Sequence, residues 1–250
     1  MFVNERASQI IEYLKVHKKA TIGELAKALF ASESTVRRDL TEMQEAGLVA
    51  RYHGGAILLE GVGEVSIFAR AEKDAESKNR CADIAIKHFS PSTYNTIFID
   101  NSSTCLALAK KLDFANKTVI TNGLQVALAL SQKPDIQLII PGGTVNSSTS
   151  AIMGSLTLRT LDLFNVDLML SSCAGIDGVC TNELSLETAQ LKQVALSKSK
   201  YKMLVATENK FSTDASYRVQ PLDEYDCVIT DASDEIIEPF KNKNINICNS

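Results

Sequence analysis

The segment SESTVRRDLTEMQEAGLV, residues 32–49, decides how the N-terminal part of this chain is interpreted. Val36, Leu40 and Met43 recur at helical spacing, which predicts the inward face of a helix over residues 33–46. The outer face, near the helix start, then carries Ser34, Arg38 and Thr41, with Arg37 on the flank. A helix that reads the major groove of DNA presents its base-contacting side chains from this position. The segment therefore predicts a recognition helix.

The residues around this helix predict the rest of a winged helix-turn-helix over residues 1–58. Thr21 and Glu24 form a capping-box pattern at the start of an earlier helix, and Ser32 is a favoured N-cap. Residues 48–58 form two extended runs about a glycine turn, which is typical of a β-hairpin wing. A merely solvated arginine pair is the alternative. The expected DNA contacts are Ser32, Ser34, Thr35, Arg37, Arg38, Thr41, Arg51, Tyr52 and His53.

Charge and composition limit the classes of protein to consider. Of the net charge of −4, residues 1–56 carry +1 and the remainder carries −5. This permits a local DNA-binding patch but argues against a whole-surface nucleic-acid binder. No apolar run approaches the roughly 20 residues of a membrane helix, and the N-terminus lacks the apolar stretch of a signal peptide. The six cysteines include no C-x-x-C pair, so we expect a cytoplasmic protein with reduced thiols and no metal site.

Residues 80–250 predict an α/β domain, which follows a linker and a helix over residues 59–79. Apolar runs predict strands at residues 95–100, 117–121, 136–140, 166–171, 201–206, 227–230 and 245–248. Helical patterns fall between them at residues 105–112, 124–131, 156–164, 187–199 and 234–240. Near-continuous apolar strands that alternate with helices are typical of a mainly parallel sheet covered on both faces.

Small polar residues and glycines follow these strands, where the crevice at the carboxyl edge of a parallel sheet binds ligands. Hydroxyl and N–H groups at a helix start can hold a phosphate, lysines add positive charge, and carboxylates accept hydrogen bonds from sugar hydroxyls. Capping and turn formation are the alternative for each loop. No P-loop or G-x-G-x-x-G motif is present, which disfavours a nucleotide. The predicted small-molecule site comprises Asp100, Ser102, Ser103, Thr104, Thr121, Asn122, Gly142, Gly143, Asp177, Lys192 and Lys210.

At these residues the sequence resembles the DeoR-type regulators of sugar metabolism. The runs Ser32–Leu40 and Gly47–Ala56 match the DNA-binding signature of that family, and the resemblance covers essentially the whole chain. The further matching positions are Asp100, Ser103, Thr104, Thr121, Asn122, Gly142, Gly143, Gly154, Gly175 to Asp177, Lys210 and Phe211. The resemblance implies a winged helix-turn-helix joined to a sensing domain similar to ribose-phosphate isomerases and CoA transferases.

The resemblance also implies a function for the whole chain. It implies a non-catalytic homo-oligomer, a dimer or tetramer, that needs no cofactor and represses operons for sugar or polyol use. Double-stranded operator DNA and a phosphorylated sugar effector are the implied partners. Two positions depart from the family pattern, because Thr207 and Thr188 stand where acidic residues are usual, each beside an acidic residue, Glu208 or Glu187. The chemistry of the effector pocket is therefore expected to differ.

Two other functions remain open from the residues. The first is an active sugar-phosphate isomerase with a fused DNA-binding domain, in which Glu183 or Glu187 acts as the base. The second is a ligand-independent DNA-binding module whose α/β domain only oligomerises. Turnover by the C-terminal domain distinguishes the first, and the absence of stabilisation by any sugar phosphate favours the second.

Overall fold

The computed structural model describes residues 5–17, 19–45, 48–52, 54–58, 66–88, 93–113, 115–241 and 245–250 of the chain. The chain divides into two compact units, Met1–Ala69 and Arg70–Ser250. The predicted linker, residues 59–79, spans this division, and its residues 59–65 lie outside the described part. Each unit has a buried hydrophobic core of its own.

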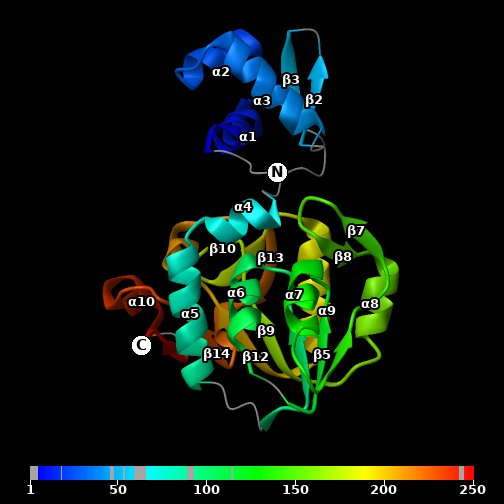
Figure 1. Cartoon of the computed structure of the whole chain (residues 1–250). Helices are drawn as coiled ribbons and strands as arrows, with labels where there is room; N and C mark the ends of the chain where they lie inside the picture. Colours follow the sequence, from blue (N-terminus) through cyan, green and yellow to red (C-terminus); the bar gives the residue numbers. More distant parts are fainter. Residues whose placement is uncertain are drawn as a thin grey trace. The chain divides into compact units, whose positions relative to one another are not determined.

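The first unit combines helices with a small antiparallel sheet (blue in Figure 1). Its elements are α1 (Glu5–His17), β1 (Lys19–Thr21), α2 (Ile22–Ala28), α3 (Glu33–Glu45), β2 (Val49–Tyr52) and β3 (Gly55–Leu58). The strands pair in the order β1-β3-β2, so the predicted β2–β3 wing carries β1 on its other edge. The sequence did not predict β1, because its three residues, KAT, are too short to show an alternating pattern. The predicted helix-turn-helix is confirmed.

Helix α3 buries the face that its sequence pattern predicts. Val36 and Leu40 are fully buried, and Met43 is 3% exposed. They join a single cluster that also contains Ile10, Ile11, Leu14, Ile22 and Leu25 of α1 and α2. Because this packing fixes the rotation of α3 about its own axis, the polar side of α3 faces away from the core.

Thr21 caps α2 with the reciprocal bonds of a capping box, as predicted. Its hydroxyl accepts a hydrogen bond from the N–H of Glu24 at 3.2 Å, and the Glu24 carboxylate accepts one from the N–H of Thr21 at 2.7 Å. Replacing Thr21 with alanine removes the acceptor at the helix start, so we expect the free energy of unfolding of this helix to fall by about 1 kcal/mol. Native-state hydrogen exchange of the α2 amides measures this fall. Thr21→Ser keeps the acceptor and should leave the exchange nearly unchanged.

A seven-stranded parallel sheet forms the centre of the second unit. Its strands are β4 (Thr96–Ile99), β5 (Lys117–Thr121), β6 (Ile136–Ile139), β9 (Val166–Ser171), β12 (Ser199–Val205), β14 (Cys227–Ile229) and β15 (Ile247–Cys248). The larger helices are α5 (Ala75–His88), α6 (Ser103–Lys111), α7 (Leu124–Ser131), α8 (Ser155–Leu161), α9 (Leu186–Ser197) and α10 (Asp234–Lys241). Every pair of neighbouring strands is parallel, which confirms the predicted fold class.

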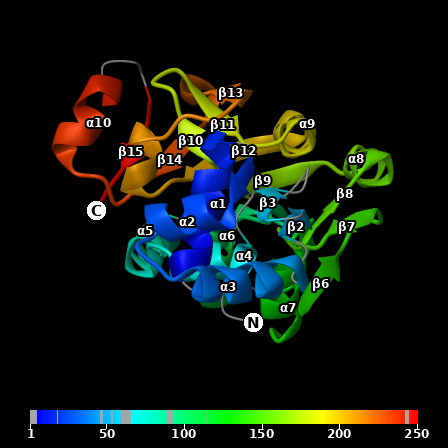
Figure 2. The same ribbon diagram turned by 90° about the horizontal axis from the view of Figure 1, so that it is seen from above.

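The strand order β15-β14-β12-β9-β4-β5-β6 reverses its direction of growth between β4 and β9. Strands β5 and β6 add on one side of this point, and β12, β14 and β15 add on the other, so β6 and β15 form opposite ends of the sheet (Figure 2). In an open parallel sheet, ligands bind outside the carboxyl ends of the strands at such a reversal. The fold therefore directs attention to the residues that follow β4 and β9.

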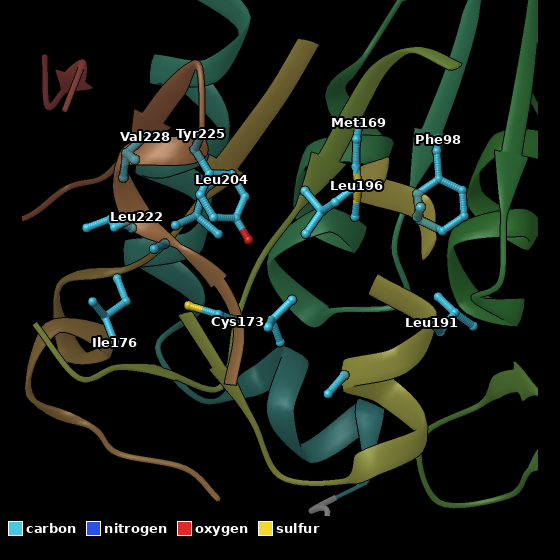
Figure 3. Close-up of a cluster of buried hydrophobic side chains, with 14 of the residues drawn as sticks. Phe98, Met169, Cys173, Ile176, Leu191, Leu196, Leu204, Leu222, Tyr225 and Val228 are labelled. Atoms are coloured by element: carbon cyan, nitrogen blue, oxygen red, sulfur yellow. The ribbon is translucent and has the colours of Figure 1, made fainter. Parts of the chain in front are cut away.

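Successive residues of β4 point to opposite faces of the sheet. Ile97 and Ile99 join one buried cluster together with residues of α5 and α6. Phe98 joins a second cluster, in which Figure 3 shows it near Met169 and near Leu191 of α9. Because helices cover both faces, both sets of side chains are apolar, and the strand has a continuous apolar sequence.

Several short elements surround this sheet without a clear signal in the sequence. They are α4 (Ile67–Glu72), β7 (Thr144–Asn146), β8 (Ala151–Met153), β10 (Gly175–Ile176), β11 (Cys180–Glu183), η2 (Glu208–Ser212), β13 (Tyr217–Pro221) and η3 (Leu222–Glu224). Strand β11 reads CTNE and lies between β10 and β13 in a separate antiparallel sheet. Such short polar strands form because neighbouring backbone groups satisfy their hydrogen bonds, which periodicity does not predict. Helix α5 also extends well beyond residue 79, to His88.

The six cysteines are free thiols, and all but Cys248 are buried. Burial raises the pKa of the Cys173 and Cys227 thiols to about 12. Within the described segments, no cluster of three or more histidine, cysteine or acidic side chains is arranged to hold a metal ion. No helix in these segments is long and apolar enough to cross a membrane.

Candidate functional site

The outer face of α3 presents the side chains predicted to contact DNA. The exposed members of this face are Ser34, Arg37, Arg38 and Thr41. The Arg37 and Arg38 side chains are 56% and 72% exposed, and each has an acidic neighbour one turn away, at 3.2 Å (Arg37 Nη2 to Glu33 Oε2) and 3.9 Å (Arg38 Nε to Glu42 Oε1). Exposed pairs of this kind contribute only about 0.3–0.5 kcal/mol. Both ion pairs are therefore weak enough for the guanidinium groups to exchange them for other partners.

Hydroxyl groups hold the start of α3. Ser32 Oγ accepts a hydrogen bond from the N–H of Thr35 at 3.2 Å, so Ser32 is the N-cap, as predicted. The same oxygen lies 2.8 Å from the hydroxyl oxygens of both Ser34 and Thr35. Thr35 is half-buried, so its part is to shape the helix start. The N–H groups of a helix start attract phosphate oxygens, which suits this end of α3 for the DNA backbone.

The wing residues have different positions from one another. Arg51 Nη1 donates to Thr41 Oγ1 at 2.7 Å, and the Thr41 hydroxyl donates to the Arg37 carbonyl at 2.9 Å. Arg51 therefore joins the wing to α3, in addition to the phosphate contact expected from the sequence. Tyr52 is 41% exposed at the end of β2. His53 lies outside the described residues.

Asp39 is a structural residue of this surface that sequence reasoning missed. Its side chain is only 2% exposed, and Arg6 of α1 donates to both of its carboxylate oxygens, with Arg6 Nη2 3.0 Å from Oδ1. A buried carboxylate needs such a partner, so the pair ties α3 to α1. A single acidic residue between the core positions Val36 and Leu40 is the signal that points to it.

In the second unit, charged groups meet where the strand order reverses. Asp100 follows β4 and Ser172 follows β9, while Lys192 reaches the same place from α9. Lys192 Nζ lies 3.0 Å from Asp100 Oδ2, donates to the Ser172 carbonyl at 2.6 Å and also bonds Glu183 of β11. Sequence reasoning did not assign Glu183 to this site and considered it only as the base of the rival enzyme.

The electrostatics of this cluster favour the charged forms of Asp100 and Lys192. Burial alone would raise the pKa of Asp100, but the charge of Lys192 and hydrogen bonds from Ser102 and Ser172 outweigh it and lower the pKa to about 2. Burial would lower the pKa of Lys192, but the charges of Asp100 and Glu183 raise it well above its usual value. An ammonium group has three donors, and all three of Lys192 are occupied. Lys192 therefore neutralises carboxylates and leaves no donor for a phosphate.

The hydroxyl residues that follow β4 and β5 organise their own loops. Ser102 caps α6, since its Oγ accepts from the N–H of Cys105 at 3.1 Å, and its own N–H donates to Asp100 Oδ1 at 2.9 Å. Ser103 and Thr104 are buried in the first turn of α6. Thr121 Oγ1 accepts from the N–H of Gly123 at 3.1 Å. For Ser102 and Thr121 the contacts are those of the capping and turn alternative.

Two further predicted residues, Lys210 and Asp177, lie in different places. Lys210 Nζ donates to the carbonyl of Ala174, just beyond β9, at 3.3 Å. Asp177 stabilises the turn after β10, where Oδ1 accepts from the N–H of Cys180 at 2.7 Å and Oδ2 from Arg218 Nε at 3.0 Å.

Gly142 and Gly143 lie where the backbone passes close to Thr157. A side chain at Gly143, whose φ is +155°, would lie 2.3 Å from Thr157 Oγ1. The same hydroxyl donates to the carbonyl of Gly142 at 2.8 Å.

Unpartnered polar atoms gather at the same edge of the sheet. Asn122 Oδ1, after β5, and Ser172 Oγ, after β9, are buried and make no hydrogen bond within the described part of the chain. The same holds for the side-chain oxygen Oδ1 of Asn182 in β11. The backbone carbonyl of Asn182 accepts a hydrogen bond from the N–H of Ala174 at 2.9 Å. An unpaired buried polar atom costs about 1–3 kcal/mol, so a polar ligand or an ordered water at this place would supply the missing partners.

The threonines at the two departures from the family pattern lie at the starts of α9 and η2. The N–H of Thr188 donates to Ser185 Oγ at 3.2 Å at the start of α9. Thr207 precedes η2, and its hydroxyl donates to Asn209 Oδ1 at 2.7 Å. Both threonines are buried, whereas Glu187 and Glu208 beside them are exposed. The adjacent carboxylates therefore do not replace the missing ones inside the crevice.

An open cavity of about 640 Å³ lies nearby in the second unit. Its lining includes Asp74, Ser77, Arg80, Glu208, Asn209 and Asp231. These residues come from the start of α5, from η2 and from the end of β14, and none of them was predicted as a site residue. Asp231 is held there by Arg80 at 2.8 Å and by the Ser77 hydroxyl at 2.5 Å. Asn209 of this lining directly precedes Lys210 in η2.

Comparison with known proteins identifies both units. Residues 6–62 match the family described as DeoR-like helix-turn-helix domain, and residues 73–232 match the DeoR C terminal sensor domain. The chain belongs to the DeoR family. It therefore joins the DNA-binding domain of that family to its sensor domain, which confirms the resemblance found in the sequence.

Similar curated DeoR-family proteins are transcription regulators. The chain is 31% identical over 236 residues to the HTH-type transcriptional regulator GolR of Listeria innocua, with 92% of this chain and 91% of that protein covered. It is 31% identical over 230 residues to the glycerol-3-phosphate regulon repressor of Escherichia coli, with 91% and 90% covered. Among solved structures, the sorbitol operon regulator SorC of Klebsiella pneumoniae overlaps 94% of this chain and 98% of its own at 12% identity and a TM-score of 0.37.

Proposed function

We propose that this protein represses an operon for the uptake or breakdown of a sugar or polyol, and that a phosphorylated sugar metabolite relieves the repression. Residues 1–58 bind the operator, residues 59–79 link the parts, and residues 80–250 sense the metabolite and form a cytoplasmic homo-oligomer. A dimer or tetramer brings a second winged helix to a second half-site, which one small domain needs for affinity. The metabolite binds one arrangement of the oligomer better and so shifts its population.

The observation that carries this proposal is the outward face of α3, on which the side chains of Arg37 and Arg38 are exposed. Core packing and the Arg6–Asp39 pair hold this helix in place. A preorganised helix with free guanidinium groups is what direct readout of the major groove requires. The unpaired polar atoms near the reversal point of the sheet support the second half of the proposal, a polar ligand in the crevice. The family of the chain is consistent with both.

Selection of genomic fragments by the purified full-length protein tests the proposal. We expect enrichment of a few sites with paired half-sites beside genes of sugar or polyol metabolism. Gel-shift titrations on such a site, with sugar phosphates of three to six carbons, should then show release by one phosphorylated sugar. The same sugar without its phosphate is the matched control and should not release the DNA. Enrichment without sequence preference would contradict the proposal.

The rival enzyme finds little support in the positions of its candidate bases. Glu183 is the buried ion-pair partner of Lys192, and Glu187 is exposed on the first turn of α9. A general base must be able to accept a proton from a substrate within hydrogen-bond reach. We expect no isomerase turnover by the purified protein, and turnover that disappears in Glu183→Gln would favour the enzyme. A ligand-independent module is favoured if no sugar phosphate raises the melting temperature.

A further inference from the structure

Two of the six cysteines lie next to each other at one end of the central sheet. Cys227 belongs to β14, and Cys248 belongs to β15, the strand at the sheet edge (Figure 2). Their sulfur atoms are 3.8 Å apart, and Cys227 Sγ donates to Cys248 Sγ. Among the described residues, no other two cysteine sulfurs make such a contact. Neither cysteine belongs to the sites described above.

The register of the two strands puts both thiols on the same face of the sheet. Cys248 pairs with Ile229, two residues beyond Cys227, and alternate residues of a strand share a face. Cys227 and Ile229 are buried in the cluster that contains residues of α5 and α6, and Cys248 packs against that cluster. The two sulfurs therefore face each other across neighbouring strands.

Strand β15 is able to bring the sulfurs together. A disulfide joins sulfurs about 2.05 Å apart, so the pair must close by roughly 2 Å. Strand β15 has two residues and β14 as its single neighbour in the sheet. The backbone bonds at this edge include those from the N–H of Val228 to the Asn246 carbonyl, at 2.8 Å, and from the N–H of Thr230 to the Cys248 carbonyl, at 3.0 Å. A shift of so short an edge strand leaves the rest of the sheet in place.

Cys248 is the thiol that an oxidant reaches first. It is half-buried, whereas Cys227 is 2% exposed. Burial, reinforced by the adjacent Cys248 thiol, raises the pKa of Cys227 to about 12. Because oxidation of a thiol depends on its accessibility and its thiolate character, Cys248 reacts first and Cys227 is its resolving partner.

We propose that Cys227 and Cys248 form a reversible oxidation site, which takes a peroxide as its oxidant and closes into a disulfide between β14 and β15. The Cys248 sulfur takes one oxygen atom from hydrogen peroxide, which gives a sulfenic acid and one water. The Cys227 sulfur then attacks this sulfur, the S–S bond forms, and the sulfenic oxygen leaves as a second water with the thiol proton of Cys227. Two thiols and one hydrogen peroxide thus give one disulfide and two waters.

The disulfide closes a loop over residues 228–247, which contains α10. Phe240 of α10 packs edge-on against Phe211 of η2, with ring centroids 5.3 Å apart. A cross-link restricts the open states of the loop that it closes. Oxidation therefore slows the local opening of β15 and of α10.

Oxidation of the folded full-length protein by hydrogen peroxide tests the proposal. The remaining thiols are then alkylated under denaturing conditions and counted by intact mass, and peptide mass spectra locate the link. Cys248→Ser and Cys227→Ala are treated beside wild type. Cys180→Ala is the matched control, because it removes a buried thiol of β11, which belongs to a different sheet.

We expect wild type to lose two of its six thiols to a Cys227–Cys248 link that dithiothreitol reverses, and Cys180→Ala to lose the same two. Cys248→Ser should keep all its thiols. Cys227→Ala should stop at a sulfenic acid on Cys248, which dimedone traps. Amide exchange in β15 should slow at least about tenfold in the oxidised wild-type protein.

Two outcomes would overturn the proposal. Loss of no thiol, or oxidation of Cys248 without a link to Cys227, would show that the two sulfurs do not meet. A link between two chains would show that the partner thiol of Cys248 lies outside its own sheet. Both results come from wild-type protein, so they remain decisive if a cysteine variant does not fold.

Discussion

Replacing Lys192 with methionine is expected to lower the free energy of unfolding of the sensor domain by about 3–5 kcal/mol. The side chain is 4% exposed and lies between the carboxylates of Asp100 and Glu183, which are 0% and 7% exposed. Methionine fills a similar volume but leaves two buried negative charges without a partner. It also removes the donor to the Ser172 carbonyl. The loss arises mainly from the stranded charges, since an intact buried pair has little net effect.

Urea denaturation followed by circular dichroism measures this loss, and two further variants test its cause. Lys200→Met removes an exposed lysine, 74% exposed, that pairs with Asp167, so it should cost less than about 1 kcal/mol. Adding Glu183→Gln to Lys192→Met removes one stranded charge and should restore part of the stability. A double variant no more stable than Lys192→Met would show that lost packing, and not charge, causes the effect.

The pH dependence of stability follows from the same cluster. The pKa of Asp100 lies near 2, below its unfolded value, so its contribution in wild type is fully present above about pH 4 and is lost as the pH falls toward 2. The pKa of Lys192 is raised, so its contribution is lost only as the pH rises beyond the usual lysine range. In Lys192→Met, protonation removes the buried negative charges that have lost their partner. The difference in free energy of unfolding between wild type and Lys192→Met should therefore shrink as the solution is acidified from pH 7 to 4.

Replacing Arg38 with alanine is expected to weaken operator binding by about 1–3 kcal/mol, roughly five- to 150-fold, if Arg38 contacts a base bidentately. Arg38 is the more exposed of the two α3 arginines, and its only ion-pair partner in the described structure is Glu42, at 3.9 Å. The substitution removes no core contact, because the core side of α3 is formed by other residues. Folding of the variant should therefore be preserved.

Gel-shift titrations at several salt concentrations separate the possible roles of Arg38. Loss of a base contact relaxes sequence preference at one operator position, whereas loss of a phosphate contact lowers affinity on all sequences and reduces the salt slope by about one. Arg159→Ala is the control, since it removes an exposed arginine of the sensor domain. Unchanged affinity and unchanged salt dependence in Arg38→Ala would exclude Arg38 from the interface.

The recognition helix could be predicted from local patterns, whereas the side-chain contacts that hold it to the wing and to α1 could not. The spacing of Val36, Leu40 and Met43 predicts the buried side of α3, because helix period and core burial are linked in a short segment. The contact from Arg51 to Thr41 joins the wing to the helix, and the pair of Arg6 with Asp39 joins residues 33 positions apart. Such contacts depend on how the elements pack, which periodicity does not encode.

The sequence predicts where the polar loops of the sensor domain meet better than it predicts what their side chains bind. Polar residues after each strand predict the carboxyl edge of the sheet, because every strand of a parallel sheet ends on the same side. The use of Lys192 as the partner of two carboxylates, and of Ser102 and Thr121 as caps, became visible only when the loops were in place. In the part of the chain that the structure describes, Nε and Nη2 of Arg70 in α4 are buried without an acceptor, and an arginine in a short helix gives no sequence signal of this.

Residue order alone was enough for the two-domain plan, the inward side of α3, the capping of α2 and the parallel sheet, because each rests on contacts between neighbours along the chain or on a repeating pattern. Three-dimensional packing had to establish which charges meet: Arg6 with Asp39, and Lys192 with Asp100 and Glu183. The physical reason is that the strength and role of a charge depend on burial and on partners distant in the chain.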